Sequence, residues 1–342
     1  MPTYDRSELV PYRAPRWLPG GHAQTIYAAQ FAPRPSVEYR RERWDTPDGD
    51  FIDVDWLLNR IEEQGLRIEG TRPTSRLTPH ASRPLVVLFH GLEGSSHSHY
   101  ALSLMHAVRN RGWSGVVVHF RGCSGELNRL PRAYHSGDSA EIDWVLRRLA
   151  HGGAPIYAVG VSLGANALLK WLGERGTEAA SLVRRAAAIS APFDLTAAGN
   201  ALDCGFNLVY TRHFLRSMRR KAIAKLAFHR GLYEAAAVAR AHTLRAFDDL
   251  VTAPLHGYRD TDDYWTRASS KPLLTRIAVP TLLVNAQNDP FLPRAALPLS
   301  HEVSPSVSVE FPEEGGHVGF VSGPFPGSLA WLPQRVLGYF WP

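Results

Sequence analysis

A Gly-x-Ser-x-Gly pattern centred on Ser162 carries the clearest chemistry in this chain of 342 residues. The apolar residues 157–161 before it predict a short strand, and residues 165–172 after it predict a helix. A turn this abrupt strains the serine backbone, so the positions two before and two after it must lack bulk, as Gly160 and Gly164 do. The start of a helix also favours negative charge that develops beside the hydroxyl. The pattern therefore predicts a nucleophilic serine, and a structural Gly/Ser turn is the alternative.

A serine hydroxyl is a poor nucleophile at neutral pH, so it needs a base that an acid orients. In a parallel sheet with such a turn, the acid and then the histidine follow later strands. Asp289 follows the next-to-last predicted strand and His317 follows the last one, in a Gly-rich loop. We predict that Asp289 is the acid and His317 the base. The alternatives are a turn-forming aspartate before proline and an ordinary loop histidine. Glu313 and Glu314 are second choices for the acid.

Two backbone amides are candidates to hold the oxyanion of a tetrahedral intermediate. One belongs to Leu92, in the sequence FHGLEG that follows the first buried strand, and the other belongs to Leu163, beside the serine. Gly91 and Gly94 would permit the close turn that brings the first donor to the serine. A plain loop between a strand and a helix is the alternative.

Other reactive residue types lack a convincing context. His90, His97 and His99 have weak ligand spacing without a fixed carboxylate partner, so we expect no metal. Cys123 lies in a Gly-rich loop but not at a strand-to-helix turn, so we do not expect it to be a nucleophile, while Arg121 in the same loop could brace the site by ion pairing. Neither a P-loop nor a dinucleotide-binding Gly-x-Gly-x-x-Gly occurs, and we expect no cofactor.

The elements that must position these residues alternate between strands and helices, which predicts a mostly parallel, doubly wound α/β sheet of about eight strands. The continuous apolar runs in the middle of the chain are typical of strands buried on both faces. Strands are predicted at residues 37–44, 51–58, 85–89, 116–120, 157–161, 186–190, 281–285 and 307–311, and helices at 100–111, 139–149, 165–172 and 328–339.

One segment breaks the alternation, because residues 195–278 contain several helical patterns and no clear strand. We predict that it is a helical cap over the carboxyl edge of the sheet, where open α/β folds bind ligands. The predicted domains are an N-terminal arm (1–35), a core in two parts (36–194 and 279–342) and the cap between them.

Three further stretches lie outside the predicted core elements. Residues 17–26 of the arm are too irregular for a long helix and could pack over a domain edge, and residues 60–84 predict an exposed loop. Residues 206–228 of the cap form a basic amphipathic stretch, which can lie on an anionic lipid surface. The sequence favours instead a cap helix with a solvated basic face. We expect no stable membrane anchor, with peripheral contact through the cap as the open alternative.

Composition bounds the class of protein. A hydrophobic fraction of 44% suits one large α/β domain with an insertion, or two domains. The net charge of +6 comes without an Arg/Lys run interleaved with aromatics, so we expect no nucleic-acid partner. Cys123 and Cys204 lie far apart and fit a reducing compartment. No secretory signal or long apolar window occurs, so we expect a cytoplasmic protein. The sequence leaves the oligomeric state open.

Several motifs together resemble the YheT-like branch of the α/β-hydrolase superfamily, over about residues 22–340. They are HAQT at 22–25, HGLEGS at 90–95, FRGCSG at 120–125, GVSLGAN at 160–166, YWTRAS at 264–269 and GGHVGF at 315–320. The resemblance implies Ser162, Asp289 and His317 as the triad, and hydrolysis of carboxylic esters without a cofactor. Ala165 departs from the pattern, which has glycine there.

We therefore predict a serine hydrolase that acts through an acyl-enzyme. Its predicted substrates are small molecules, namely short- or medium-chain carboxylic esters. A lipid or phospholipid hydrolase, an amidase, a thioesterase or a lactonase would use the same triad, because the triad serves all acyl transfers. A non-catalytic binding protein is the alternative of another class. Dehalogenases with this fold need an aspartate at the turn, and Ser162 excludes that chemistry.

Overall fold

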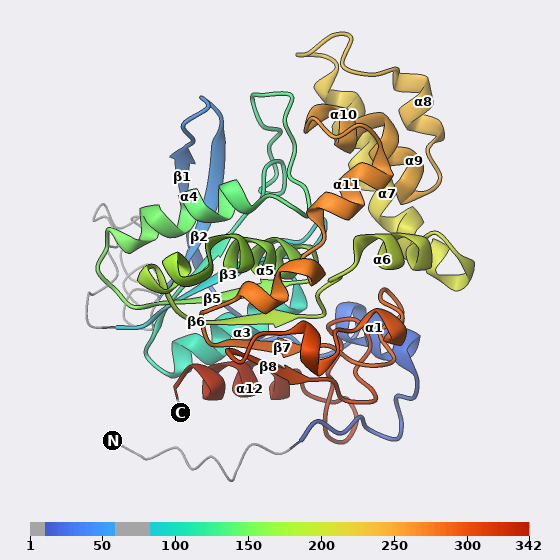
Figure 1. The fold of residues 1–342 in the computed structure, drawn as a ribbon. Coiled ribbons are helices and arrows are strands. Elements are labelled where there is room, and N and C mark those ends of the chain that lie inside the picture. The colour runs from blue at the N-terminus through green and yellow to red at the C-terminus, as the bar shows by residue number, and fades with distance from the viewer. Residues whose placement is uncertain (1–10, 59–82, 342) are drawn as a thin grey trace.

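An eight-stranded sheet organises the described chain, which comprises residues 11–58 and 83–341 of a computed structural model. The strand order is β1-β2-β4-β3-β5-β6-β7-β8, and β2 pairs antiparallel with both β1 and β4, while the other neighbouring strands pair in parallel (Figure 1). This confirms the predicted mostly parallel, doubly wound sheet. The strands are β1 (Tyr39–Asp45), β2 (Phe51–Leu57), β3 (Leu85–Phe89), β4 (Ser114–Val118), β5 (Ile156–Val161), β6 (Val183–Ile189), β7 (Thr281–Val284) and β8 (Val307–Glu310).

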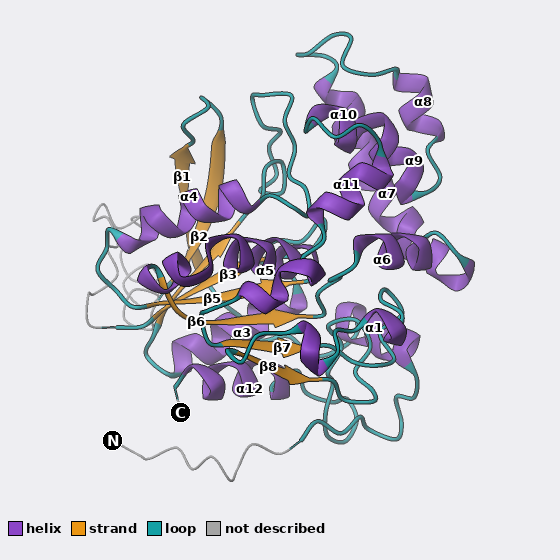
Figure 2. Ribbon diagram, viewed as in Figure 1, coloured by secondary structure: helices purple, strands orange, loops and turns teal. Residues whose placement is uncertain are grey.

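Helices cover both faces of the sheet, as Figure 2 shows, with α3 and α12 on one face and α4 and α5 on the other. Each face has its own hydrophobic cluster, because alternate residues of a strand point to opposite faces: Leu85, Val87 and Phe89 of β3 join one cluster, and Val86 and Leu88 join the other. The continuous apolar runs of the sequence are thus explained by burial on both sides. The bounds are α3 (His99–Asn110), α4 (Ser139–Ala150), α5 (Leu163–Arg175) and α12 (Trp331–Phe340).

The chain between β6 and β7, all of it described, forms helices and turns but no strand. Figure 1 shows these helices, yellow to orange, gathered beside the end of the sheet toward which β6 points. They have a hydrophobic cluster of their own, and we call residues 195–278 the cap segment; its standing as a separate domain stays a prediction. Its helices are α6 (Leu195–Leu202), α7 (Leu208–Lys225), α8 (Ala235–Arg240), α9 (Leu244–Phe247), α10 (Ala253–Leu255) and α11 (Thr261–Ala268).

The N-terminal arm contains a short helix of ten residues, α1 (Gly21–Gln30), which the sequence did not predict although it correctly excluded a long one. The sequence signal is weak since no apolar face repeats along this helix. Buried polar side chains stabilise it instead, including Gln24 and Thr25, whose partners lie about 290 residues away in the chain. Tertiary contacts override local propensity here.

Two other expectations concern the predicted loop at 60–84 and membrane-spanning helices. Almost all of the predicted loop at 60–84 lies outside the described residues. Within the described ranges, no helix combines the length and the apolar character needed to cross a bilayer.

Candidate active site

The strand β5 passes into α5 through Ser162, whose backbone has φ 53° and ψ −119°. This left-handed value is unusual for a residue with a side chain and is a sign of local strain. Gly160 and Gly164 make the turn sterically allowed. A Cβ on Gly160 would lie 2.5 Å from Ala165 Cα, and a Cβ on Gly164 would collide with the carbonyl oxygens of Phe89 and His90. The steric reason for both glycines, inferred from the sequence, therefore holds in the structure.

We expect Gly164→Ala to lower the free energy of unfolding by about 3 kcal/mol, because backbone atoms at the contact leave the new methyl group no space. The measurement is a urea denaturation curve. Gly49→Ala is the control, since Gly49 also has a left-handed φ of 84° but open space around a Cβ. In that variant the free energy of unfolding should fall by only about 1 kcal/mol, because alanine is strained at a left-handed φ but meets no neighbouring atom. Equal losses in the two variants would contradict a steric requirement at the turn.

The structure brings the three predicted side chains into one hydrogen-bonded chain. His317 Nε2 lies 2.9 Å from Ser162 Oγ, and His317 Nδ1 lies 2.9 Å from Asp289 Oδ2. A carboxylate only accepts, so Nδ1 carries the ring proton and Nε2 accepts from the serine hydroxyl. Asp289 is 5% exposed, and its Oδ1 accepts from the backbone N–H of Phe291 at 2.8 Å. Phe291 also stacks on the His317 ring, with centroids 4.0 Å apart, and thus limits its rotation.

The alternative acids lie elsewhere. Glu313 and Glu314 are exposed, and Glu314 accepts a hydrogen bond from Gln24 Nε2 at 3.3 Å. Neither forms a hydrogen bond with His317 in the described structure, where the partner of Nδ1 is Asp289.

The loop that contains Leu92 lies directly against the serine turn. A Cβ on Gly91 would be 3.0 Å from Ser162 Cβ, and both Leu92 and Leu163 line the same cavity as Ser162. In this loop Glu93 has a left-handed backbone (φ 55°). Gly91 and Gly94 are needed for a different reason, because neighbouring atoms leave little space for a Cβ at either position. The role of the Leu92 and Leu163 amides as oxyanion donors stays a prediction.

Residues of the N-terminal arm hold the loop of the histidine, which the reasoning from residue chemistry missed. Gln24, fully buried, accepts through Oε1 from the Gly315 N–H (2.8 Å) and from Asn288 Nδ2 (3.0 Å). Thr25 Oγ1 accepts from the His317 N–H at 2.8 Å and donates to a backbone carbonyl of α1. The only sequence signal for these contacts was the HAQT motif of the family resemblance.

Three more side chains fix the backbone on either side of His317. Asn288 Oδ1 accepts from the Gly316 N–H (2.9 Å), and Ser190 Oγ accepts from the Val318 N–H (3.0 Å). His99 Nε2 donates to the Val318 carbonyl at 2.9 Å, while burial lowers the pKa of His99 to about 4, so its ring is neutral at neutral pH. Side chains from four separate regions of the chain thus position the loop.

We expect Thr25→Val to lower kcat for the predicted ester hydrolysis about tenfold with little change in KM, because the N–H of His317 loses its acceptor and the imidazole loses its exact position. Thr25→Ser keeps the hydroxyl and should restore most of the rate. The measurement is steady-state kinetics of both variants. A threonine that only stabilises the arm would lower the melting temperature without changing kcat of the folded enzyme.

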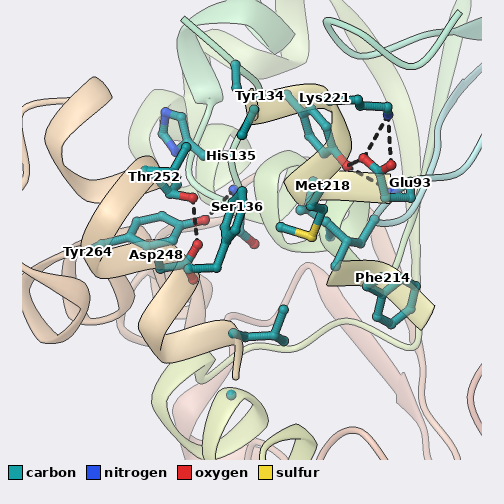
Figure 3. Close-up of a pocket in the computed structure, with 18 of the residues that line it drawn as sticks. Glu93, Tyr134, His135, Ser136, Phe214, Met218, Lys221, Asp248, Thr252 and Tyr264 are labelled. Atoms are coloured by element: carbon teal, nitrogen blue, oxygen red, sulfur yellow. Dashed lines mark hydrogen bonds and ion pairs between the residues drawn. The ribbon is translucent and has the colours of Figure 1, made fainter. Parts of the chain in front are cut away.

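A cavity of about 170 Å³ opens beside Ser162, lined by residues of the core and of the cap segment. That volume greatly exceeds the ~10–15 Å³ that a single buried water needs, so a substrate group of several atoms fits. Its lining is mainly apolar, and Phe214 and Met218 of α7 contribute to it (Figure 3). Lys221 of α7 forms an ion pair of 2.8 Å with Glu93, which also accepts from the Tyr134 hydroxyl at 2.9 Å. The cap thus contacts the loop of Leu92 through a charged pair.

The remaining residues singled out in the sequence serve the structure. His90 is fully buried and neutral, because burial lowers its pKa to about 3, and its Nε2 accepts from the Phe120 N–H. Burial raises the pKa of the Cys123 thiol to about 12, so it carries no thiolate at neutral pH. Arg121 forms the expected ion pairs, with Glu141 at 2.6 Å among them. In the part of the chain that is described, no group of three or more His, Cys, Asp or Glu side chains could hold a metal.

Comparisons with known proteins agree with this architecture. A family model of the α/β-hydrolase fold matches residues 84–324. The chain is 39% identical over 334 residues to YheT of Escherichia coli (strain K12), a candidate esterase by name. The match includes 96% of this chain and 92% of YheT.

More distant relatives and solved structures extend the comparison. The chain is 29% identical over 331 residues to phospholipase ABHD3 of Mus musculus, which aligns over 95% of this chain and 76% of the relative. A solved esterase of Pyrococcus furiosus shares the fold with a TM-score of 0.53 at 15% identity, over 90% of this chain and 96% of that one. The chain therefore belongs to the α/β-hydrolase fold family, in the branch that contains YheT.

Proposed function

We propose that this protein is a serine hydrolase that cleaves carboxylic esters through an acyl-enzyme. The observation that carries the proposal is the hydrogen-bonded chain from Ser162 through His317 to Asp289, at a strained turn that faces an apolar cavity. A nucleophile, a base and an orienting acid in this order are the parts that acyl transfer requires. The names of the relatives, a candidate esterase and a phospholipase, support the same class.

In the first half of the reaction, Ser162 Oγ attacks the ester carbonyl while His317 Nε2 takes the hydroxyl proton. The N–H groups of Leu92 and Leu163 hold the oxyanion, and each such donor typically contributes about 3–4 kcal/mol of transition-state stabilisation. The carbonyl re-forms as the alcohol leaves with the proton from His317. Asp289 holds the Nδ1 proton and stabilises the imidazolium that exists between these two transfers.

In the second half, His317 removes a proton from water, and the resulting hydroxide attacks the acyl-enzyme carbonyl. The same two amides hold the second oxyanion, and the proton returns to Ser162 Oγ as the acid departs. The catalytic groups regain their starting protonation states.

The substrates we propose are short- or medium-chain acyl esters, because the cavity is mainly apolar and is lined on one side by the cap segment. Hydrolysis of lipid esters is the second candidate. Two observations favour it: exposed apolar side chains on the cap, Phe206 (55% exposed) and Phe228 (75% exposed), and relatives named as a phospholipase and as a monoacylglycerol lipase. Such exposed apolar groups can contact a lipid surface.

A fluorophosphonate probe and an ester panel test the proposal. We expect the probe to label the purified protein once, with peptide mapping placing the label on Ser162. We expect p-nitrophenyl esters of short and medium acyl length to turn over faster than long ones. Absence of both labelling and turnover would contradict a serine hydrolase, whereas a rate maximum confined to long-chain phospholipids would favour the lipid hydrolase.

A further inference from the structure

A buried carboxyl group lines the cavity on the side of the cap. Asp248 begins a π-helical turn, Asp248–Thr252, and is 8% exposed. Short π-helical turns are rare and occur often at functional sites. Figure 3 shows Asp248 with Thr252 and Tyr264 on one side of the cavity, and Glu93 with Lys221 on the other. The cavity that Ser162 faces is therefore apolar in the main but contains a polar region under the cap.

The carboxyl group has hydrogen-bond partners but no counter-ion. Thr252 Oγ1 donates to Oδ1 at 2.6 Å, and Trp265 Nε1 donates to Oδ2 at 2.9 Å. Among the ion pairs of the described residues, none includes Asp248. A carboxylate oxygen can accept two hydrogen bonds, and each oxygen of Asp248 has one donor among the described residues, so each retains acceptor capacity. Burying a carboxylate without a cation is unfavourable, and a buried carboxyl group with a shifted pKa that lines a cavity is a candidate functional group.

Other hydroxyl groups lie at the same place. Tyr264 Oη accepts from the Ser136 N–H at 2.9 Å, which leaves the phenol proton for a further acceptor. Ser136, Thr252 and Tyr264 line the cavity together with Asp248, and we call these four residues the polar subsite. Burial raises the pKa of Asp248 to about 7, so near neutral pH the carboxyl group can both donate and accept. The polar subsite thus offers donors and acceptors within an apolar surround.

We propose that the polar subsite binds a hydroxyl group on the acyl chain of the ester, so that the enzyme prefers hydroxylated acyl esters to plain ones of equal length. This inference rests on the proposed ester hydrolysis. A hydroxyl group both donates and accepts, so it matches the free acceptor sites of Asp248 and the phenol proton of Tyr264, which line the same cavity. A plain hydrocarbon chain would cover the carboxyl group and leave its free acceptor sites unpaired, which a site built for hydrogen bonds penalises strongly.

Charge and connectivity select this class of ligand. An ammonium group gains little here, because near neutral pH the carboxyl group of Asp248, whose pKa burial raises to about 7, is only partly ionised. A second carboxylate would be repelled by Asp248 itself. The acyl half of the ester is the half that stays bonded to Ser162 after the alcohol leaves, so a subsite in the same cavity as Ser162 suits the acyl chain.

The test measures kcat/KM of the purified enzyme for p-nitrophenyl octanoate and for a series of p-nitrophenyl hydroxyoctanoates. In this series the hydroxyl group moves along the acyl chain one carbon at a time. We expect at least one isomer to be preferred about tenfold or more over octanoate, mainly through KM. Equal values for octanoate and every isomer would overturn the subsite while leaving ester hydrolysis intact. Absence of turnover for all of these esters, together with absence of fluorophosphonate labelling, would instead remove the proposed function on which the subsite rests.

A pair of variants assigns the preference to Asp248. Asp248→Asn keeps the volume and one acceptor oxygen but loses the charge, and we expect it to reduce the preference for the hydroxylated isomer about tenfold. Asp249→Asn is the matched control, because Asp249 is the exposed neighbour and accepts from the Thr261 N–H outside the cavity lining. A preference that both variants retain would overturn the role of Asp248, and the wild-type series remains decisive if Asp248→Asn does not fold.

Discussion

Ser162→Ala is expected to lower kcat for ester hydrolysis by about 10⁴- to 10⁶-fold. The alanine has no oxygen to attack the carbonyl, and His317 Nε2 loses the hydroxyl that lies 2.9 Å away. The residual rate would come from the oxyanion donors and from substrate binding alone. Steady-state kinetics with a short-chain p-nitrophenyl ester measures the loss, and fluorophosphonate labelling should disappear with it.

Folding of this variant can be separated from catalysis. Alanine has the same backbone demands as serine at the strained turn, so the free energy of unfolding should change by less than about 1 kcal/mol. Ser181→Ala is the control, because Ser181 is exposed, donates to a carbonyl in its own turn and lies outside the cavity lining. Its activity should equal that of wild type. An active Ser162→Ala enzyme with an intact fold would show that another nucleophile performs the reaction.

Asp289→Asn is expected to lower kcat about 10⁴-fold with a much smaller change in KM. The reason lies in the second bond of the carboxylate. Because Oδ1 accepts from the Phe291 N–H at 2.8 Å, an asparagine would keep its oxygen there and turn its amide NH₂ toward His317 Nδ1. Nδ1 would then accept and Nε2 would carry the proton, so the ring could no longer take a proton from Ser162.

Kinetics of Asp289→Asn and of a surface control measure this effect. Asp262→Asn removes an exposed carboxylate that pairs with Arg245, and its kcat should match wild type. A loss of less than about tenfold in Asp289→Asn would mean that another group orients the histidine. Adding Glu313→Gln and Glu314→Gln to that variant would identify it.

The strands and the helices of the core could be predicted because their signals are local. The apolar runs of β3 and β7 start at the same residues in the sequence pattern and in the structure. Ends of helices were less accurate. The predicted C-terminal helix starts at residue 328, whereas α12 begins at Trp331. The order of serine, acid and histidine along the chain was also readable, since each residue follows a recognisable strand.

The short helix of the arm was not predicted from the sequence. Helix α1 is stabilised by Gln24 and Thr25, whose partners are the loops of Asn288 and His317. Such contacts leave no periodic trace in the sequence around residue 24. The polar subsite under the cap was also not predicted, because Asp248 and Ser136 come together only when the cap segment folds over the core.

The sequence by itself determined the class of fold, the turn at Ser162 and the Gly-rich loop of the histidine after the last strand. These follow from hydrophobic periodicity and from the steric demands of a sharp turn, which act over a few residues. Only the tertiary structure decided which carboxylate contacts His317, how the arm positions its loop and where a buried carboxyl lines the cavity. Those features depend on hydrogen-bond distances between segments far apart in the chain, which no local pattern encodes.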